Sequence, residues 1–306
     1  MTSIKQQTLA SELSFQGKGL HTGKTSHMVL KPAPAGTGIL FRRIDLGPDA
    51  IVEALAENIS STARSTTISM GEASVATIEH IMSALTGMGI DNALIDIDNV
   101  EVPILDGSAR FYVEAISASG VSVQDAPRKY IDIPREIEVR DENTGSFVRL
   151  SPSDRPEIDI TIDFGSKVLG VQTAHWDENV DYAAAIAPCR TFVFFHEIAY
   201  LFRNNLVKGG DMDNAIVIAE HPVTKEQLSE LSALFNVPEL EIKEGYLNNL
   251  RLRFPDECGR HKLLDLIGDL RLSGGYLNAK VTAFKPGHTI NASLTRAVRN
   301  IQENNQ

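Results

Sequence analysis

Stretches with a helical repeat of apolar side chains alternate along this chain with stretches that repeat every two residues. In residues 76–85 the apolar side chains recur on one face of a helix, at Ile78, Ile81, Met82 and Leu85. Gly87 and Gly89 end this helix, and residues 93–98 then alternate apolar and polar side chains as a strand does. The first half of the chain is therefore predicted to contain a helix that leads directly into a strand.

The second half of the chain repeats this order. A helix is predicted over residues 260–270, where the core-facing side chains are Leu263, Leu264, Ile267 and Leu270. Gly274 and Gly275 end it, and residues 277–284 alternate as a second strand. We infer an α+β fold made of two related units, each with a sheet backed by helices.

The boundary between the units is predicted at the polar stretch of residues 124–128. This gives an N-terminal domain over residues 1–126 and a C-terminal domain over residues 127–306. The start of the first domain reads as β structure, with strands expected at residues 13–15, 26–31 and 38–43. A ligand pocket between the two domains is expected, because domain interfaces are preferred places for such pockets.

Composition and charge exclude several classes of protein. The 306 residues carry a formal net charge of −11, which disfavours a broad polyanion-binding surface, so no nucleic-acid partner is expected. Cys189 and Cys258 form no disulfide framework, which fits a reducing cytoplasm. No signal peptide and no apolar run of membrane-spanning length is visible, so any contact with a membrane is expected to be peripheral.

The helix over residues 260–270 carries a candidate metal site. His261, Asp265 and Asp269 stand four residues apart each time and share one stripe. An imidazole and a carboxylate one turn apart can both reach one divalent ion such as zinc. Taken alone, the same spacing is more typical of a surface pair, and that alternative stays open at this point.

Glu79 and His80 supply a candidate general base and a third candidate ligand for this metal site. They are neighbours at the edge of the first apolar helix, so the histidine can hold an ion while the carboxylate takes a proton from water. With His80, His261 and Asp265 as three protein ligands, a catalytic zinc keeps a fourth position open. The alternative for Glu79 and His80 is a solvated helix edge, which the apolar character of the helix disfavours.

His288 is a candidate general acid. It stands on a turn of residues 285–289, after the strand of the second unit, where it could lean over the metal site and protonate the departing nitrogen of an amide. Asp269, one turn beyond Asp265, could fix its tautomer and charge. A solvent-exposed loop histidine is the alternative reading.

Two familiar catalytic motifs are incomplete in this chain. Gly23-Lys24-Thr25 ends like a phosphate-binding loop, but Lys18 stands where that loop needs a glycine. His196-Glu197 begins like the metalloprotease signature, but Tyr200 occupies the second ligand position. The strand-like run of residues 190–195 contains three phenylalanines that cannot all face one side of a strand, so it reads either as core or as an apolar binding surface.

In their order along the chain, these segments resemble one known family. The segments that carry the resemblance are Gly19-Leu20-His21-Thr22-Gly23, Thr77-Ile78-Glu79-His80, Asp106-Gly107-Ser108-Ala109, Arg190-Thr191-Phe192, residues 261–269 and Lys285-Pro286-Gly287-His288. From about residue 5 to about residue 300 the chain is similar to the UDP-3-O-acyl-N-acetylglucosamine deacetylases, the zinc amidases of bacterial lipid A synthesis.

The resemblance implies a fold and a set of roles. The family fold is two β-α-α-β sandwich domains with the active site between them. By resemblance, zinc is held by His80, His261 and Asp265, and Glu79 is the general base. The resemblance also implies that His288 is the cationic acid or oxyanion stabiliser, that Asp269 is its partner and that Thr191 donates a hydroxyl hydrogen bond to the oxyanion. A pair of acid and base residues and a single bifunctional Glu79 are both compatible with the sequence.

The substrate contacts are likewise implied by the resemblance. The pocket for the UDP-linked, acylated N-acetylglucosamine is expected to include His21, Phe164, Phe192, Glu197 and Lys262, and an insert near residues 190–214 is expected to receive the fatty chain. Glu197 departs from the aspartate of the best-known members, which leaves that contact open. The segment over residues 220–247 is longer than in many members and has no role assigned.

The resemblance also sets expectations about partners. We expect a monomer in the bacterial cytoplasm, at the inner-membrane surface, and the chain could be natively fused to a hydroxyacyl-carrier-protein dehydratase. Two other functions stay open, namely a sugar-nucleotide-binding protein without catalysis and a zinc hydrolase of another amide.

Overall fold

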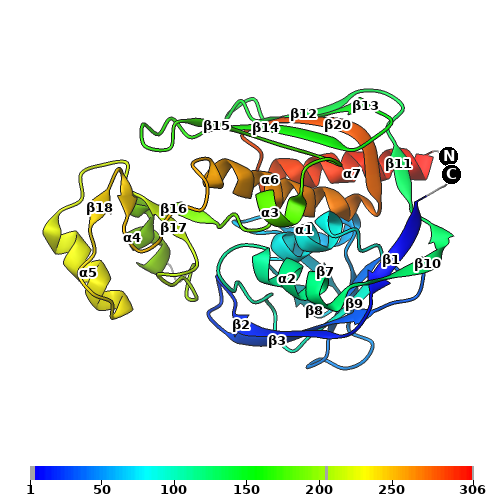
Figure 1. Cartoon of the computed structure of the whole chain (residues 1–306), viewed down its shortest axis with the longest axis horizontal. Helices are drawn as coiled ribbons and strands as arrows, with labels where there is room; N and C mark the ends of the chain where they lie inside the picture. The colour runs from blue at the N-terminus through cyan, green and yellow to red at the C-terminus, as the bar shows by residue number, and fades with distance from the viewer. Residues whose placement is uncertain (1–3, 204–205, 305–306) are drawn as a thin grey trace.

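Two sheets enclose a layer of helices in the computed structural model of the chain, which describes residues 4–203 and 206–304 (Figure 1). The first sheet holds, in spatial order, β2 (Leu13–Lys18), β3 (Thr25–Pro32), β9 (Ala93–Ile97), β4 (Ile39–Arg43) and β5 (Ile51–Glu53). Burial alternates along β3, as the two-residue repeat of the sequence requires. The strands expected near residues 13, 26, 38 and 93 are therefore confirmed.

The second sheet has the same pattern of strand pairing as the first. It holds β12 (Ile137–Arg140), β13 (Phe147–Pro152), β20 (Tyr276–Phe284), β14 (Glu157–Asp163) and β15 (Val171–Asp177), with β11 (Tyr130–Asp132) alongside β20. In both sheets the successive pairs are antiparallel, antiparallel, parallel and antiparallel. The expectation of two related α+β units is confirmed.

Each unit places one helix before its central strand and another after it. These helices are α1 (Glu79–Gly87) and α2 (Arg110–Ser119) in the first unit, and α6 (Glu257–Leu270) and α7 (His288–Asn304) in the second. The apolar faces predicted for α1 and α6 are buried in one continuous core. α1 packs directly on α6 at Gly268, where an added Cβ would lie 2.0 Å from the carbonyl oxygen of Glu79. Only glycine permits this approach, which brings the chemistry-bearing residues of the two helices together.

A smaller module projects from the second unit, at the left of Figure 1. It consists of β16 (Phe192–Phe194), α4 (Phe195–Arg203), β17 (Ile216–Ile218), α5 (Lys225–Phe235), β18 (Ile242–Lys243) and β19 (Tyr246–Leu247), and it has a small core of its own. The insert expected over residues 190–214 is part of it, except that residues 204–205 lie outside the described residues. The segment over residues 220–247 supplies α5, β18 and β19, so it completes this module.

Short elements complete the described fold. β1 (Lys5–Leu9) pairs with β10 (Val121–Pro127), and β6 (Ile59–Ser61), β7 (Thr67–Met70) and β8 (Ala73–Val75) form a small sheet. The other short elements are η1 (Ala56–Asn58), α3 (Tyr182–Ala185) and η2 (Arg271–Ser273). The boundary predicted near residue 126 falls at the end of β10, in a strand and not in a loop. Within the described ranges, no helix has both the length and the apolar character needed to cross a membrane.

Candidate metal centre and acid–base pair

α1 and α6 bring His80, His261 and Asp265 together in the interior between the two units. The Oδ1 atom of Asp265 lies 3.5 Å from Nε2 of His80 and 3.4 Å from Nε2 of His261. All three side chains are buried, and their candidate ligand atoms lie within 4.8 Å of one another. The reading of His261 and Asp265 as a surface pair is therefore wrong, because α6 is covered by α1 and the second sheet.

The donor set fits a divalent cation. Oδ1 of Asp265 is buried without a hydrogen-bond partner, whereas Oδ2 accepts a hydrogen bond from Nζ of Lys262 at 2.7 Å. Burial alone would raise the pKa of Asp265, but the neighbouring cationic groups outweigh it and hold that pKa well below its usual range. A buried, ionised carboxylate oxygen that accepts no hydrogen bond is energetically costly. A divalent cation bound between this oxygen and the two imidazole nitrogens would remove that cost.

His261 is held in the tautomer that a metal ligand needs. Its Nδ1 lies 3.1 Å from the carbonyl oxygen of Cys189, which can only accept a hydrogen bond, so Nδ1 carries the proton and Nε2 offers its lone pair. Burial lowers the pKa of His261 to about 3, so the ring is neutral.

Glu79 lies beside this cluster as a buried carboxyl group. Its Oε2 accepts a hydrogen bond from the backbone N–H of Thr66 at 3.0 Å, and its Oε1 lies 3.8 Å from Nε2 of His288. Burial raises the pKa of Glu79, although the positive charge of His288 opposes that rise. A carboxyl group with a raised pKa is matched to proton transfer near neutral pH. Glu79 is not at a solvated helix edge, since it is 3% exposed.

His288 forms the other half of an acid–base pair. It begins α7 instead of standing on the expected turn, and its Nδ1 lies 3.0 Å from Oδ2 of Asp269. Asp269 also accepts hydrogen bonds from Thr66 Oγ1 at 2.6 Å and from Asn291 Nδ2 at 2.8 Å. Burial alone would lower the pKa of His288, but the carboxylates of Asp269 and Glu79 outweigh it and raise that pKa to about 9. His288 is therefore a cation at neutral pH.

Thr66 and Asn291 are the residues of this centre that sequence reasoning missed. Asn291 stands three residues after His288, a spacing that puts both on one helix face, so a signal for it was present. Thr66 lies between β6 and β7, and nothing in its local sequence distinguishes it. Only the fold places its hydroxyl on Asp269 and its N–H on Glu79.

Three expected substrate contacts lie next to the metal cluster. The Phe192 ring is 6.5 Å from that of His261 and 5.6 Å from that of Phe164, between ring centroids, and Nζ of Lys262 is 5.8 Å from the Phe192 centroid. Phe164 is 48% exposed, so the group of Phe164, Phe192 and Lys262 extends from the metal cluster to the surface. The run over residues 190–195 is a strand only at β16, and its Phe192 and Phe194 are half-buried. Phe195 starts α4, where Glu197 accepts a hydrogen bond from the N–H of Phe194.

An apolar cavity of about 140 Å³ opens between this cluster and the small module. Thr191 and His21 are among the residues that line it. Nδ1 of His21 lies 2.8 Å from the carbonyl oxygen of Leu206, and its Nε2 is buried without a partner. Leu20 of the first unit and the charged side chains of Arg64 and Asp211 also line the cavity. The other apolar side chains of the lining come from the module: Phe192, Val193, Ile198, Leu201, Val207, Met212, Ala215, Val217 and Phe235.

Glu101 fixes the loop that carries His21, a role with no signal in the local sequence. Its buried carboxylate accepts hydrogen bonds from the N–H groups of His21 and Thr22 at 2.9 and 2.8 Å, and from the hydroxyl of Thr77 at 2.9 Å. Thr77 has a φ of 60° and stands two residues before Glu79. Glu101 thus connects the His21 loop to the start of α1.

A second group with metal-ligand chemistry lies on the outer face of the second sheet. It comprises Glu157, Asp159 and His175, which are partly or fully exposed. The ammonium group of Lys280 already lies 2.6 Å from Glu157 and 3.1 Å from Asp159, so these carboxylates have a cation. The buried cluster between α1 and α6 is the better candidate.

Comparison with known proteins places the chain in a family. The model of the LpxC family, described as UDP-3-O-acyl N-acetylglycosamine deacetylase, matches residues 6–231 and 240–300. A UDP-3-O-acyl-N-acetylglucosamine deacetylase of Thioalkalivibrio sulfidiphilus is 38% identical over 298 residues, which cover 96% of this chain and 90% of that protein. A bifunctional enzyme LpxC/FabZ of Porphyromonas gingivalis is 44% identical over 296 residues, or 96% of this chain and 64% of that protein. A bifunctional enzyme LpxC/FabZ of Chlorobaculum tepidum is 35% identical over 99% of this chain and 66% of its own length. The chain thus spans somewhat under two thirds of the bifunctional relatives.

Proposed function

Because the chain belongs to the UDP-3-O-acyl N-acetylglycosamine deacetylase family, we propose that it hydrolyses the acetamide of UDP-linked 3-O-acyl-N-acetylglucosamine to acetate and a free amine. In lipid A biosynthesis this is the committed step. The observation that carries the proposal is the unpartnered Oδ1 of Asp265, which faces His80 and His261 next to the Glu79–His288 pair.

The proposed cofactor is zinc, held by His80, His261 and Asp265. When bound there, zinc supplies Lewis-acid polarisation of the carbonyl and a lowered pKa for water. Two neutral imidazoles and one carboxylate form a ligand set typical of catalytic zinc, and His261 already has the required tautomer. The orphaned Oδ1 of Asp265 supports a cation on protein grounds alone.

The protein groups divide the proton transfers between them. Glu79 takes a proton from the water that attacks the acetamide carbon, a role suited to its raised pKa. Protonated His288 stabilises the developing oxyanion and gives its Nε2 proton to the amine nitrogen as the C–N bond breaks, while Asp269 holds Nδ1. The hydroxyl of Thr191 is the proposed second donor to the oxyanion. The alternative is a single bifunctional Glu79 that takes the proton from water and gives it to the amine nitrogen. The cation of His288, whose Nε2 lies 3.8 Å from Oε1 of Glu79, would then only stabilise the oxyanion.

Activity is expected to fall at alkaline pH as His288 loses its proton. Its pKa is raised to about 9, so the acid form persists through neutrality and is lost as pH rises through that value. A bound divalent cation would lower this pKa by repulsion, so the alkaline limb of kcat/KM is expected at or below about pH 9. The measurement is the pH profile of wild type and His288→Gln. An unchanged alkaline limb in His288→Gln would assign that limb to another group.

The proposed substrate site joins the cluster of Lys262, Phe164 and Phe192 to the apolar cavity. Lys262 offers a positive charge to the anionic UDP-sugar, and the two rings and His21 offer faces and edges to the sugar. The fatty chain would enter the cavity beside the small module, whose lining is mostly apolar. Glu197 lies in the first turn of α4, and its contact with substrate stays a proposal.

Filling the cavity should weaken binding of long-chain substrates. Ala215 lines it, so Ala215→Trp is expected to raise KM for a long-chain substrate at least about tenfold, because excluding two methylenes already costs about 1.6 kcal/mol. KM for a short-chain analogue should change little. The matched control is Ala233→Trp, since Ala233 is exposed on α5 of the same module and does not line the cavity. Equal effects on both substrates would contradict the assignment of the passage.

Acetate release is the experiment that tests the function. Purified protein is incubated with the UDP-linked acyl sugar, after chelation and after zinc is added back. We expect acetate with metal and none after chelation. Tight substrate binding without acetate release would indicate a binding protein, and release of acetate only from other amides would indicate another hydrolase.

Partners and location remain proposals. The bifunctional LpxC/FabZ names of two relatives support a native fusion of this unit to a second enzyme, for which the sequence resemblance suggests a hydroxyacyl-carrier-protein dehydratase. We further propose that the deacetylase unit acts as a monomer in the cytoplasm, at the inner-membrane surface where its acylated product is used.

A further inference from the structure

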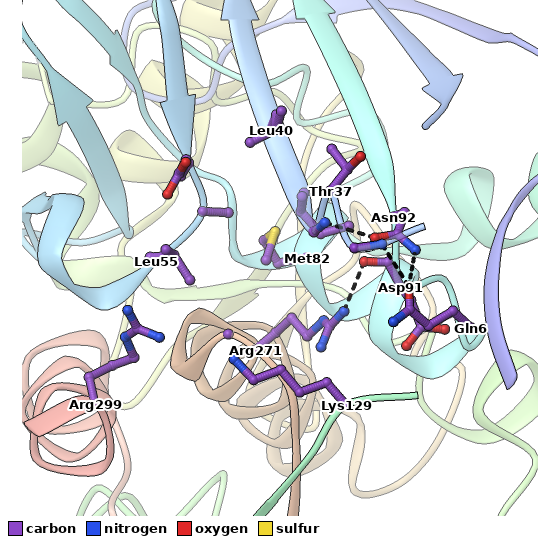
Figure 2. A pocket seen from close by; sticks show the side chains of 16 residues that line it. Gln6, Thr37, Leu40, Leu55, Met82, Asp91, Asn92, Lys129, Arg271 and Arg299 are labelled. Atoms are coloured by element: carbon purple, nitrogen blue, oxygen red, sulfur yellow. Dashed lines mark hydrogen bonds between the residues drawn. The ribbon is translucent and has the colours of Figure 1, made fainter. Parts of the chain in front are cut away.

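A cavity of about 280 Å³ lies where the end of α6 meets the loop before β4 (Figure 2). Its walls come from both units, with residues 36–40 on one side and Lys129, Arg271 and Arg299 on the other. None of the residues proposed for the metal centre, the acid–base pair or the acyl passage lines it. The proposed function therefore gives this cavity no role.

Three cationic side chains converge on this cavity from three segments of the second unit. Lys129 precedes β11, Arg271 begins η2 and Arg299 lies on α7. A Cβ placed on Gly274 would lie 3.2 Å from Nη1 of Arg299 and 3.9 Å from Nζ of Lys129, so the two charges gather around one point. This concentration of positive charge contrasts with the formal net charge of −11 for the whole chain.

Protein groups neutralise only part of this charge. Arg271 is 7% exposed, yet no described carboxylate forms an ion pair with it, and its Nε is buried without an acceptor. Its Nη2 donates to the backbone carbonyl of Asp91 at 3.2 Å, because the carboxylate of Asp91 is taken by Arg128 and by the N–H of Gln7. The C-terminal end of α6 favours a cation here but provides only a partial negative charge.

Lys129 and Arg299 differ in their partners. Arg299 is paired with Glu57, whereas Nζ of Lys129 has no hydrogen bond or ion pair to any described residue. Partial desolvation, together with repulsion from Arg299 and Arg271, lowers the pKa of Lys129, although the residue is exposed as a whole. An anion between these groups would supply the missing acceptors and relieve the repulsion between like charges.

The opposite wall of the cavity indicates what the rest of an anionic ligand would look like. Figure 2 shows Thr37, Leu40 and Asn92 facing the cations across the cavity. The amide of Asn92 is already hydrogen-bonded to Gln6, Gly38 and Gln124, so it only shapes this wall. Glu53 also lines the cavity, so a ligand with negative charge at both ends is disfavoured, whereas a hydroxyl group of the ligand could bond to Thr37 or Glu53. The volume is close to the lower limit of about 300 Å³ for small-molecule pockets. We propose that this cavity binds a compact phosphate monoester with a hydroxylated body, the phosphate lying among Lys129, Arg271 and Arg299.

Calorimetric titration of the zinc-loaded protein with glycerol 3-phosphate, and separately with inorganic phosphate, tests the proposal. Lys129→Gln removes the unpaired charge from an exposed side chain, so the fold should survive. We expect saturable binding of one glycerol 3-phosphate per wild-type chain and at least about tenfold weaker binding to Lys129→Gln, since a hydrogen bond to a charged group is lost. Lys129→Glu should abolish binding. Weaker binding of inorganic phosphate than of glycerol 3-phosphate would support a role for the opposite wall.

Two control variants separate this site from other lysines and from the active site. Lys243→Gln removes the same charge from an exposed side chain in the small module, and Lys262→Gln removes the cation next to the metal cluster. Both should bind glycerol 3-phosphate within about twofold of wild type if the site is the α6 cavity. Absence of binding to wild type, equal binding to Lys129→Gln, or loss of binding in Lys262→Gln would each overturn the proposal.

Discussion

Replacing Glu79 with alanine should lower kcat by about 10²–10⁴-fold while the protein still binds one zinc ion. Glu79 is buried, its pKa is raised, and it is not one of the three proposed ligands. Its loss removes the group that accepts the proton of the attacking water. Acetate release under saturating substrate, together with metal analysis of the same sample, measures both halves of this expectation.

Controls for Glu79 need to separate chemistry from structure. Glu79→Gln keeps the side-chain volume and can still accept the hydrogen bond from the N–H of Thr66, so it should fold like wild type and lose activity as Glu79→Ala does. Glu72→Gln, at an exposed carboxyl group, should be fully active. Normal turnover by Glu79→Ala would show that another group is the base. A larger loss in Glu79→Ala and Glu79→Gln than in His288→Gln would favour Glu79 as the residue that acts twice.

Much of the metal centre could be predicted from the sequence, because helical spacing is a local property. Four-residue steps put His261, Asp265 and Asp269 on one face of a helix whatever the tertiary structure is. The same holds for the apolar faces of α1 and α6, which determine how the helices pack. The repeat of helix, glycine and strand was also visible, and the matching strand order of the two sheets explains it.

The rest of the centre depends on contacts between distant segments. Thr66 lies 203 residues before Asp269 along the chain, yet its hydroxyl lies 2.6 Å from that carboxylate. Neither that contact nor the parallel pairing of β4 with β9 and of β14 with β20 has a local signal. The aromatic side chains of residues 190–195 favour β structure and predict one strand, whereas the structure ends the strand at Phe194 and starts α4 at Phe195. A capping glutamate at residue 197 was the available sign of a helix start.

Replacing His261 with alanine should abolish stoichiometric zinc binding and, with it, activity. Loss of a partner that merely orients a ligand already weakens metal binding by about 10–100-fold, so loss of a ligand should exceed that range. Because His261 is 1% exposed, the variant's folding has to be measured by circular dichroism and thermal melting. Asp265→Asn is the second test, since it keeps the side-chain shape, removes the ionised oxygen and should also lose zinc.

His175→Ala is the matched control for metal loss, because His175 belongs to the exposed group with Glu157 and Asp159. That variant should retain one zinc ion per chain and full activity, since Lys280 already neutralises those carboxylates. The assignment would be wrong if folded His261→Ala and Asp265→Asn retained zinc while His175→Ala lost it. That result would place the metal on the outer face of the second sheet. The buried cluster would then leave Oδ1 of Asp265 unpartnered, which is the energetic cost that a cation between α1 and α6 removes.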